Sequence, residues 1–538
     1  MDKEFCLLDE SWIKVLNDEN EIKEVSLIDV FTNAHKYKRL AGETATQDVA
    51  ILRLLLAITI TVFYRYDADG REDDVLNYSN PEDEILDRWS DYWEKGLFES
   101  DAFRNYLEKY RERFYLFHPV TPFWQVADLK MGTDYSTVSL LGNIKESNNT
   151  DTMHHFHMTY GKYIENLSYS EAARWLIYTN AYSVNVKTKI SNKFIPVGIG
   201  RLSQLGFICV EDASLFNTIL LNLCALNNQG DAWARPLPIW EQDIRQKPGI
   251  EISPPDNLAQ LYTIQSRRLL LKKDTKDGKR ITGFKSTGGD YYSTINDYIE
   301  PMTLLKWIDK EKNNFQPQIH QKEIAAWREF PSLFVEDELK PGLISWLECL
   351  SANFLLDNES LITFQMTGLL YADKTRYTNG ELINESVSLS KDLLNEIGKI
   401  WLSLIIDQIN KCENVDKICF YKFAQTLTSD MYIGDNKGSK DVIKVKTNRI
   451  QNKLSESYYY KIDSAFREWL LSIDPNSSNR DNKLYEWQAT SSAIADNIVK
   501  KYISGLNPQY TLLSTHAYKA FKIALNKLYS KKQEKGGD

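Results

Sequence analysis

The stretch from Leu40 to Tyr66, LAGETATQDVAILRLLLAITITVFYRY, constrains the fold more than any other segment of this chain. Its apolar residues recur at helical spacing and also fill the opposite side, which predicts a helix buried on most of its surface. Thr46 is the expected N-cap, and Asp48 suits the positive end of the helix dipole. Arg53 interrupts the run, and the uncharged stretch after it is too short to span a membrane. We therefore expect the central helix of a large soluble domain.

The size and composition of the chain indicate a globular protein with more than one core. A length of 538 residues predicts two or three domains. A hydrophobic content of 43% excludes global disorder. The formal net charge of −9 argues against a uniform nucleic-acid-binding coat, but it leaves room for local basic strips.

No sequence motif supports catalysis, a cofactor or a metal. The six cysteines are scattered without a CxxC pair, which favours free thiols over a zinc ribbon or a redox motif. Phosphate-loop, dinucleotide-binding and serine-hydrolase motifs are absent from the sequence. The acidic N-terminus, MDKEFCLLDE, has no apolar core, so we expect no signal peptide, no membrane partner and a cytoplasmic protein.

The order of the predicted elements gives an α+β fold with a change of character near residue 388. A strand, a hairpin and a helix are expected within residues 1–39, and strands dominate 258–310. The polar segment 130–152 is expected to be a loop, and Ser170 is the expected N-cap of the helix that follows LSY. Amphipathic helices are predicted at roughly 390–411, 415–432, 455–473, 485–503 and 511–530. We therefore predict a large mixed N-terminal domain, residues 1–385, and a C-terminal all-α four-helix bundle, residues 386–538.

A histidine cluster offers one candidate site. His154, His155 and His157 follow Asp151, but the helical spacings typical of zinc-binding histidines are missing and no cysteine lies nearby. A loop of polar and aromatic contact residues is the favoured interpretation. A metal-dependent nuclease that uses this cluster is kept as the alternative.

Basic strips offer a second class of candidate. The strip from 267 to 285 has eight cations against Asp274 and Asp277, a local charge of +6: Arg267, Arg268, Lys272, Lys273, Lys276, Lys279, Arg280 and Lys285. Such residues give phosphate affinity without sequence information, although a merely solvated hairpin is an equal alternative. A basic loop or hairpin at 184–201 adds Lys187, Lys189 and Lys193, and a basic connector is expected at 437–453. The polar loop 368–380 follows an apolar strand, a usual place for recognition residues.

An ordered series of segments carries a family resemblance over nearly the whole chain. The series is FCLLDESWIKV, EVSLIDVF, LAGETATQDVAILRLLLAI, PFWQV, HHF, LSYSEAARWLI, PLPIWEQD, SRRLLL, RITGF and AAWREFP. In this order the segments resemble the large subunit (Cse1/CasA family) of the type I-E Cascade complex, the CRISPR RNA-guided surveillance complex of bacteria and archaea. No single segment is diagnostic.

The resemblance implies a non-catalytic subunit with the two-domain architecture given above. Its expected partners are the other Cascade subunits, the 5′ handle of the CRISPR RNA, double-stranded target DNA and a helicase–nuclease. Family members recognise the short protospacer-adjacent motif in DNA, help to open the duplex into an R-loop and recruit the helicase–nuclease. In this arrangement the protein recognises the adjacent motif, and base pairing between guide RNA and target strand recognises the remaining target sequence. A structural scaffold without DNA contact is the remaining alternative.

The resemblance also implies residue roles. Phe156, flanked by His155 and His157, matches the family's guide-handle loop. Lys285, after the strand RITGF, matches its minor-groove lysine, and Ala372, Asp373 and Lys374 match its wedge loop, without the glutamine of well-known members. The family's glycine-rich DNA-facing loop falls near 183–200, where Lys187, Lys189 and Lys193 would act through charge. The segment DTKDGK stands where some members have a cysteine-rich knuckle, so no zinc is implied.

Overall fold

The structure is a computed structural model of the chain. It describes all residues except 1–2, 141–165, 184–185, 191–192, 198–199, 244–246, 248, 275–278, 294, 297–298, 323, 335–338, 357–360, 371–380, 433–439 and 531–538. The chain divides into two units: Met1–Ala326, Ser332–Leu356 and Ile362–Ser386 form the first, and Trp327–Pro331, Asp357–Leu361 and Val387–Asp538 form the second. The first mixes helices with small sheets and the second is built from long helices, which confirms the predicted α+β class.

The first unit begins with the predicted hairpin and helix. Strands β2 (Ile13–Asn17) and β3 (Ile22–Val25) pair antiparallel, and β4 (Tyr37–Leu40) extends the sheet on the other side of β2. Helix α1 (Leu27–Asn33) follows, and its N-cap, Ser26, accepts a hydrogen bond from the Asp29 amide. Strand β1 (Glu4–Cys6) pairs with β5 (Tyr115–Phe117).

Helix α2 (Ala45–Arg65) is the core helix that the apolar stretch predicts. It is long and apolar enough to cross a membrane, but 94% of its most apolar window is buried inside the protein. Thr44 is the N-cap and accepts from the Gln47 amide, so the prediction of Thr46 is wrong by two residues. Thr46 is instead buried within the first turn.

A buried ion pair explains how an arginine fits inside this helix. The guanidinium of Arg53 donates to both carboxylate oxygens of Glu300, at 2.6 and 3.0 Å, and stacks 4.1 Å from the ring centroid of Tyr262. The Arg53 side chain is 4% exposed and that of Glu300 is fully buried. Two well-aligned hydrogen bonds therefore compensate the desolvation of both charges.

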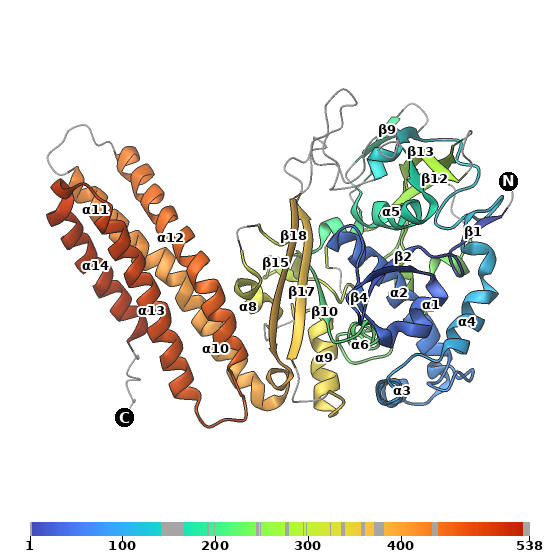
Figure 1. The fold of residues 1–538 in the computed structure, drawn as a ribbon, viewed down its shortest axis with the longest axis horizontal. Helices are drawn as coiled ribbons and strands as arrows, with labels where there is room; N and C mark the ends of the chain where they lie inside the picture. Colours follow the sequence, from blue (N-terminus) through green and yellow to red (C-terminus); the bar gives the residue numbers. More distant parts are fainter. Residues whose placement is uncertain are drawn as a thin grey trace. The chain divides into compact units, whose positions relative to one another are not determined.

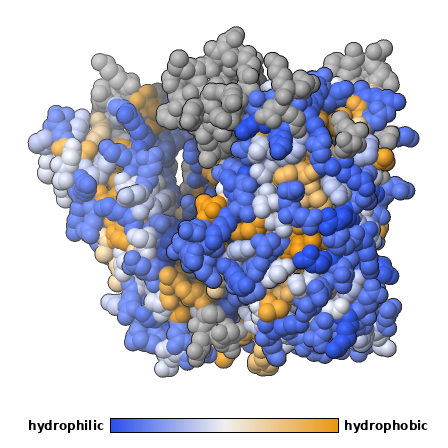
Figure 2. Space-filling model, turned by 45° about the vertical axis from the view of Figure 1, so that its right-hand side comes forward, coloured by the Kyte–Doolittle hydropathy of each residue, from blue (hydrophilic) through white to orange (hydrophobic). Residues whose placement is uncertain are grey.

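The remaining elements of the first unit surround α2 or form short sheets (Figure 1). Helices α5 (Tyr169–Tyr182), α6 (Leu215–Leu221) and α7 (Leu258–Tyr262) contact α2. Further elements are α3 (Pro81–Lys95), α4 (Ser100–Lys109), α9 (Gly342–Ala352), β10 (Phe207–Glu211), β11 (Ile250–Glu251), β14 (Asp290–Tyr291), β15 (Leu305–Asp309), β16 (Asn314–Pro317), β17 (Leu361–Leu370) and β18 (Glu381–Ser390). Parts of β17 and β18 are assigned to the second unit. On the face shown in Figure 2, hydrophilic residues predominate and hydrophobic residues gather in small separate patches.

Ser168, and not Ser170, caps helix α5. The Ser168 hydroxyl accepts from the Glu171 amide, and the Glu171 carboxylate accepts from the Ser168 amide at 2.8 Å, which completes a capping box. The helix consequently begins at Tyr169, two residues earlier than a Ser170 cap would allow. The four-residue spacing S-x-x-E was visible in the sequence.

The carboxyl of Asp48 gives the start of α2 a pH-dependent stability. It accepts from the Gly42 amide at 2.7 Å, but burial raises its pKa to about 7 from 3.8, with Glu43 and Glu211 adding to the shift and Arg39 opposing it. Because the folded pKa lies above the unfolded one, stability falls as the pH rises from about 4 to about 7. The penalty is at most about 4 kcal/mol above pH 7.

Asp48→Asn retains the acceptor oxygen and removes the titration. We expect the variant to match the natural protein in thermal midpoint near pH 4 and to exceed it at pH 8. Thermal unfolding followed by circular dichroism across this range measures the difference. A gap that stays constant with pH would show that Asp48 does not titrate as proposed.

The second unit consists of long helices (orange to red in Figure 1). Helix α10 (Glu396–Asn414) continues through a π-helical segment (Val415–Phe420) into α11 (Tyr421–Met431), so the first two predicted helices form one rod. Helices α12 (Lys440–Leu471), α13 (Arg480–Ser504) and α14 (Thr511–Tyr529) follow. In the described residues, α11 contacts α12 and α14, and α13 contacts the same two helices. The basic segment expected to be a connector is helical from Lys440 onward.

Aromatic side chains fill the interior of the second unit. Trp487 lies 5.1 Å from Phe466 and 5.2 Å from Trp469 between ring centroids. Trp327, in the 3₁₀ helix Ala326–Glu329 just before α8 (Phe330–Leu333), stacks on Phe466 at 4.4 Å and donates its indole N–H to Asp463 at 2.9 Å. This contact explains why Trp327–Pro331 belongs to the second unit although its neighbours in sequence belong to the first.

Candidate nucleic-acid interface

Lys285 lies in the middle strand of a small sheet in the first unit. Strand β13 (Arg280–Gly288) pairs antiparallel with β12 (Arg267–Lys273) on one side and with β6 (Thr133–Ser136) on the other. Strand β7 (Leu167–Ser168) pairs with the start of β13. In this register Lys285 stands opposite Leu270 on β12 and Asp134 on β6.

The two faces of this sheet differ in chemistry. Phe284 stacks on Tyr135 with a centroid distance of 5.3 Å, and the Leu271 side chain beside them is buried, so this face belongs to the core. Because side chains alternate along a strand, Lys285 lies on the opposite face with its pairing partner Asp134. Lys272 reaches the same carboxylate at 2.8 Å.

Asp134 organises the charge on this face. The hydrogen bond from Lys272, with further attraction from Lys272 and Lys285, holds the pKa of Asp134 below its usual value against a small effect of burial. Gly132 precedes β6 with φ of 144°, and a Cβ there would stand 2.7 Å from the Ser286 carbonyl oxygen and 3.1 Å from Cγ of Lys285. Glycine therefore permits the close approach of β6 to β13. Lys285 is half-buried and lies beside two charged residues, Asp134 and Lys272.

Sequence reasoning missed Asp134 because it assigned residues 130–152 to a loop. The structure places Thr133–Ser136 in a strand and Thr137–Leu140 in a 3₁₀ turn. The only available signal was the alternation in TDYS, which is too short to predict a strand.

Arg267 and Arg268 are not on a surface that phosphate can reach, which corrects the prediction for these two residues. They are 2% and 1% exposed. Arg268 donates to Asp290 at 2.5 Å and to the Gln265 carbonyl at 3.2 Å, and Arg267 donates to the Ser266 carbonyl at 2.7 Å. Their guanidinium groups are bound inside the protein at the N-terminal end of β12.

Of the other cations in the strip, Lys276 lies outside the described residues, and those that the structure describes differ in position. Lys273 pairs with Glu4 at 2.7 Å and lies 4.3 Å from the ring centroid of Phe117, so it anchors the N-terminal strand. Lys279 is exposed. Arg280 is half-buried and directs one N–H toward the Asn166 carbonyl at 3.5 Å. The described cations of the predicted basic strip therefore include both anchoring and exposed charges.

Lys187, Lys189 and Lys193 lie on a hairpin of β8 (Val186–Ile190) and β9 (Lys193–Val197), as the sequence predicts. In its register Lys187 pairs with Pro196, Lys189 with Phe194 and Lys193 with Ile190. Lys187 and Lys189 therefore share one set of alternating register positions in the hairpin, and Lys193 belongs to the other set.

Several predicted residues lie outside the described part of the chain. They are the guide-handle residues His155, Phe156 and His157, the wedge residues Ala372, Asp373 and Lys374, and the remaining members of the histidine cluster, Asp151 and His154. Within the described ranges, no group of three or more histidine, cysteine or acidic side chains is arranged to hold a metal.

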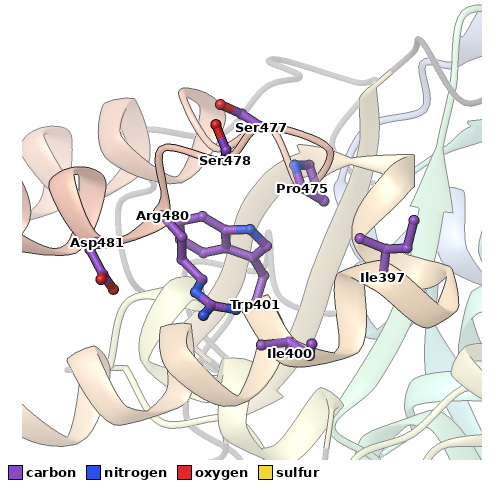
Figure 3. Close-up of a pocket in the computed structure, with 8 residues that line it drawn as sticks. All are labelled: Ile397, Ile400, Trp401, Pro475, Ser477, Ser478, Arg480 and Asp481. Carbon is purple, nitrogen blue, oxygen red and sulfur yellow. The ribbon is translucent and has the colours of Figure 1, made fainter.

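A cavity of about 300 Å³ in the second unit was not anticipated (Figure 3). Ile397, Ile400 and Trp401 of α10 line one side, and the segment from Pro475 to the start of α13 lines the other. Asp481 is its single titratable acid, and no histidine or cysteine joins it.

The fold defines an α+β protein whose second unit is built from helices. Comparison with known proteins identifies its family. The family model described as CRISPR-associated protein Cse1 matches residues 7–498. The chain belongs to this family, which confirms the predicted Cse1/CasA resemblance.

Individual relatives agree with the family. A Thermus thermophilus protein named CRISPR-associated protein CasA/Cse1 is 28% identical over 348 residues, which span 62% of this chain and 60% of that protein. The crystal structure of Thermobifida fusca Cse1 superposes with a TM-score of 0.77 at 24% identity, covering 98% of each chain. That of Acidimicrobium ferrooxidans Cse1 gives 0.78 at 21% identity, covering 98% of this chain and 99% of the other. A chain of a structure titled CRISPR RNA-guided surveillance complex gives 0.69 at 16% identity, covering 97% and 100%.

Proposed function

We propose that this chain is the non-catalytic large subunit of a type I-E Cascade complex. In this role it recognises the protospacer-adjacent motif in double-stranded DNA, helps to open the duplex for R-loop formation and recruits the helicase–nuclease. The observation that carries the proposal is the family match over residues 7–498. The likeness of the fold to a chain of an RNA-guided surveillance complex supports it.

Lys285 is the proposed minor-groove residue. It lies on the polar face of the β6–β13–β12 sheet, and Asp134 and Lys272 beside it restrict where its side chain can go. Readout in the minor groove is degenerate, so a single lysine with few companions suits the recognition of a short motif in several variants. Lys374, with Ala372 and Asp373, is the proposed wedge, and opening each base step costs a few kcal/mol.

Three further sets of residues complete the proposed interface. Lys187, Lys189, Lys193, Lys272, Lys279 and Arg280 would contact the DNA backbone through charge. His155, Phe156 and His157 would contact the 5′ handle of the CRISPR RNA. Arg267 and Arg268 are left out because they are buried.

Lys285→Ala is expected to weaken binding of a target duplex by the assembled complex about tenfold, within the range for one specific groove contact. Electrophoretic mobility shift with a labelled duplex measures this, and gel filtration checks that the complex still assembles. Lys273→Ala is the matched control, because this lysine of the same sheet is bound to Glu4. Lys374→Ala should act in the same direction as Lys285→Ala.

Two outcomes would overturn the proposal. Unchanged affinity for both Lys285→Ala and Lys374→Ala at moderate salt would favour a scaffold without DNA contact. Cleavage of plasmid by the purified chain with Mg²⁺, Mn²⁺ or Zn²⁺, lost in His155→Ala, would favour the metal-dependent nuclease.

A further inference from the structure

The outward side of helix α12 carries a stripe of exposed side chains that the proposed function does not use. The outer stripe, as we name it, consists of Lys446, Arg449, Lys453 and Tyr460, all exposed. Their spacings of three, four and seven residues place them on one side of the helix. Thr447, Leu454 and Tyr458 are buried on the other side, toward the neighbouring helices.

The charge of this segment is not neutralised within the described chain. From Lys440 to Lys453 there are five cations and one acid, Asp441, which gives +4. None of the five forms an ion pair with a described residue. Elsewhere in the second unit, basic side chains are commonly paired: Lys399–Glu396, Lys411–Asp407, Lys417–Glu413, Arg467–Asp463, Lys500–Asp496 and Lys522–Asp496. Five cations within fourteen residues of one helix, none of them paired with a described residue, make this segment a concentrated positive charge.

Aromatic rings accompany the cations. Lys446 lies 4.8 Å from the ring centroid of Tyr432 and donates to its hydroxyl, and Lys453 lies 5.8 Å from the centroid of Tyr502. These contacts restrict the two lysine side chains while leaving their charge uncompensated. Tyr460, at the end of the stripe, is 85% exposed.

Nearby acidic residues do not neutralise the positive charge of the outer stripe. Asp416 accepts hydrogen bonds from Gln451 and Ser455 of α12, so its carboxylate is engaged on the packed side of the helix. Glu456 is exposed between Lys453 and Tyr460, and it forms no ion pair with a described cation. The stripe therefore presents three cations and one free ring to solvent.

We propose that the outer stripe of α12 binds a single strand of nucleic acid without sequence specificity. Its phosphates would lie along Lys446, Arg449 and Lys453, and a base would stack on Tyr460. A duplex keeps its bases paired and stacked, so it would use the cations but not the ring, whereas a single strand uses both. The stripe extends about 21 Å along the helix, enough for several nucleotides. This inference does not depend on motif recognition through Lys285.

The test uses the full chain and a fluorescein-labelled single-stranded DNA of 20 mixed nucleotides, with binding read by fluorescence anisotropy at several salt concentrations. The triple variant K446Q/R449Q/K453Q should bind at least tenfold more weakly at low salt. Its slope of log affinity against log salt should shrink by about 2, as expected for three lost phosphate contacts on a single strand. Tyr460→Ala should weaken binding about tenfold without changing the slope, and Tyr460→Phe should restore it.

The matched control is K399Q/K417Q/K500Q, which removes three positive charges from paired lysines of the same unit. It should change the affinity less than twofold. Equal losses in the two triple variants would reduce the effect to net charge and overturn the proposal. Stripe-dependent binding to phosphatidylserine vesicles in place of the DNA would also overturn it, in favour of a membrane surface.

Two further measurements guard against ambiguous results. Photocrosslinking of the natural chain to a 5-iodouracil strand should label the peptide that contains Tyr460. Labelling confined to other peptides would contradict the proposed site, even where a variant fails to fold. Lys285→Ala should leave single-strand binding unchanged, so a failure of the proposed motif recognition and a failure of this inference give different results.

Discussion

Glu300→Ala is expected to destabilise the first unit by about 3–5 kcal/mol, because it leaves the guanidinium of Arg53 buried without its carboxylate. The Arg53 side chain is 4% exposed, so water does not replace the two lost hydrogen bonds. Arg201, 3.7 Å from the same carboxylate, would lose its ion pair as well. Hydrogen–deuterium exchange of the peptide that covers α2 measures the effect locally, independently of the second unit.

Glu251→Ala is the matched control, because this glutamate is exposed. It should leave α2 exchange unchanged. Glu300→Gln retains the shape and loses the charge, so its effect should fall between those of the other two variants. If α2 in Glu300→Ala remained as protected as in the natural chain, the buried pair would not be what stabilises this helix.

Leu55→Asp is expected to abolish folding of the first unit. Leu55 is fully buried in the middle of α2, and an ionised carboxylate there would have no partner. Leu55→Ala leaves only a cavity and should cost about 2–5 kcal/mol, so it should remain folded but with a lower thermal midpoint. Soluble expression, near-ultraviolet circular dichroism and α2 exchange distinguish the two variants. A folded Leu55→Asp protein that lacked only DNA binding would contradict the assignment of α2 to the core.

Elements with a strong local pattern were predictable from the sequence. The apolar repeat of 40–66 specifies α2 because a helix that is hydrophobic all round has few alternatives. The change to long amphipathic helices near residue 388 specifies the second unit, because apolar residues at spacings of three and four form one buried side on each helix. The ends of helices were less predictable, since Thr44 and Thr46 are chemically equivalent caps, although the S-x-x-E spacing did distinguish Ser168 from Ser170.

The candidate site was predictable in its position but not in its members. Lys285 falls in a strand because RITGF has strand propensity. Burial of Arg267 and Arg268 depends on Asp290 and on backbone carbonyls that the fold brings to them, and a count of charges along the chain contains no such information. Asp134 joins the site from β6 by pairing with Lys285, which comes about 150 positions later in the chain, and local patterns do not specify such a distant register.

The pairing of Arg53 with Glu300 also constrains how the chain is made. The two residues are separated by 247 positions, and α2 leaves the ribosome long before its partner is synthesised. At about 5–20 residues per second, the delay is about 12–50 s. During that interval the nascent chain carries a long apolar helix with an unneutralised arginine, and α5 and α7 also follow later in the chain. The first unit therefore completes its core late in translation, after Glu300 has been synthesised.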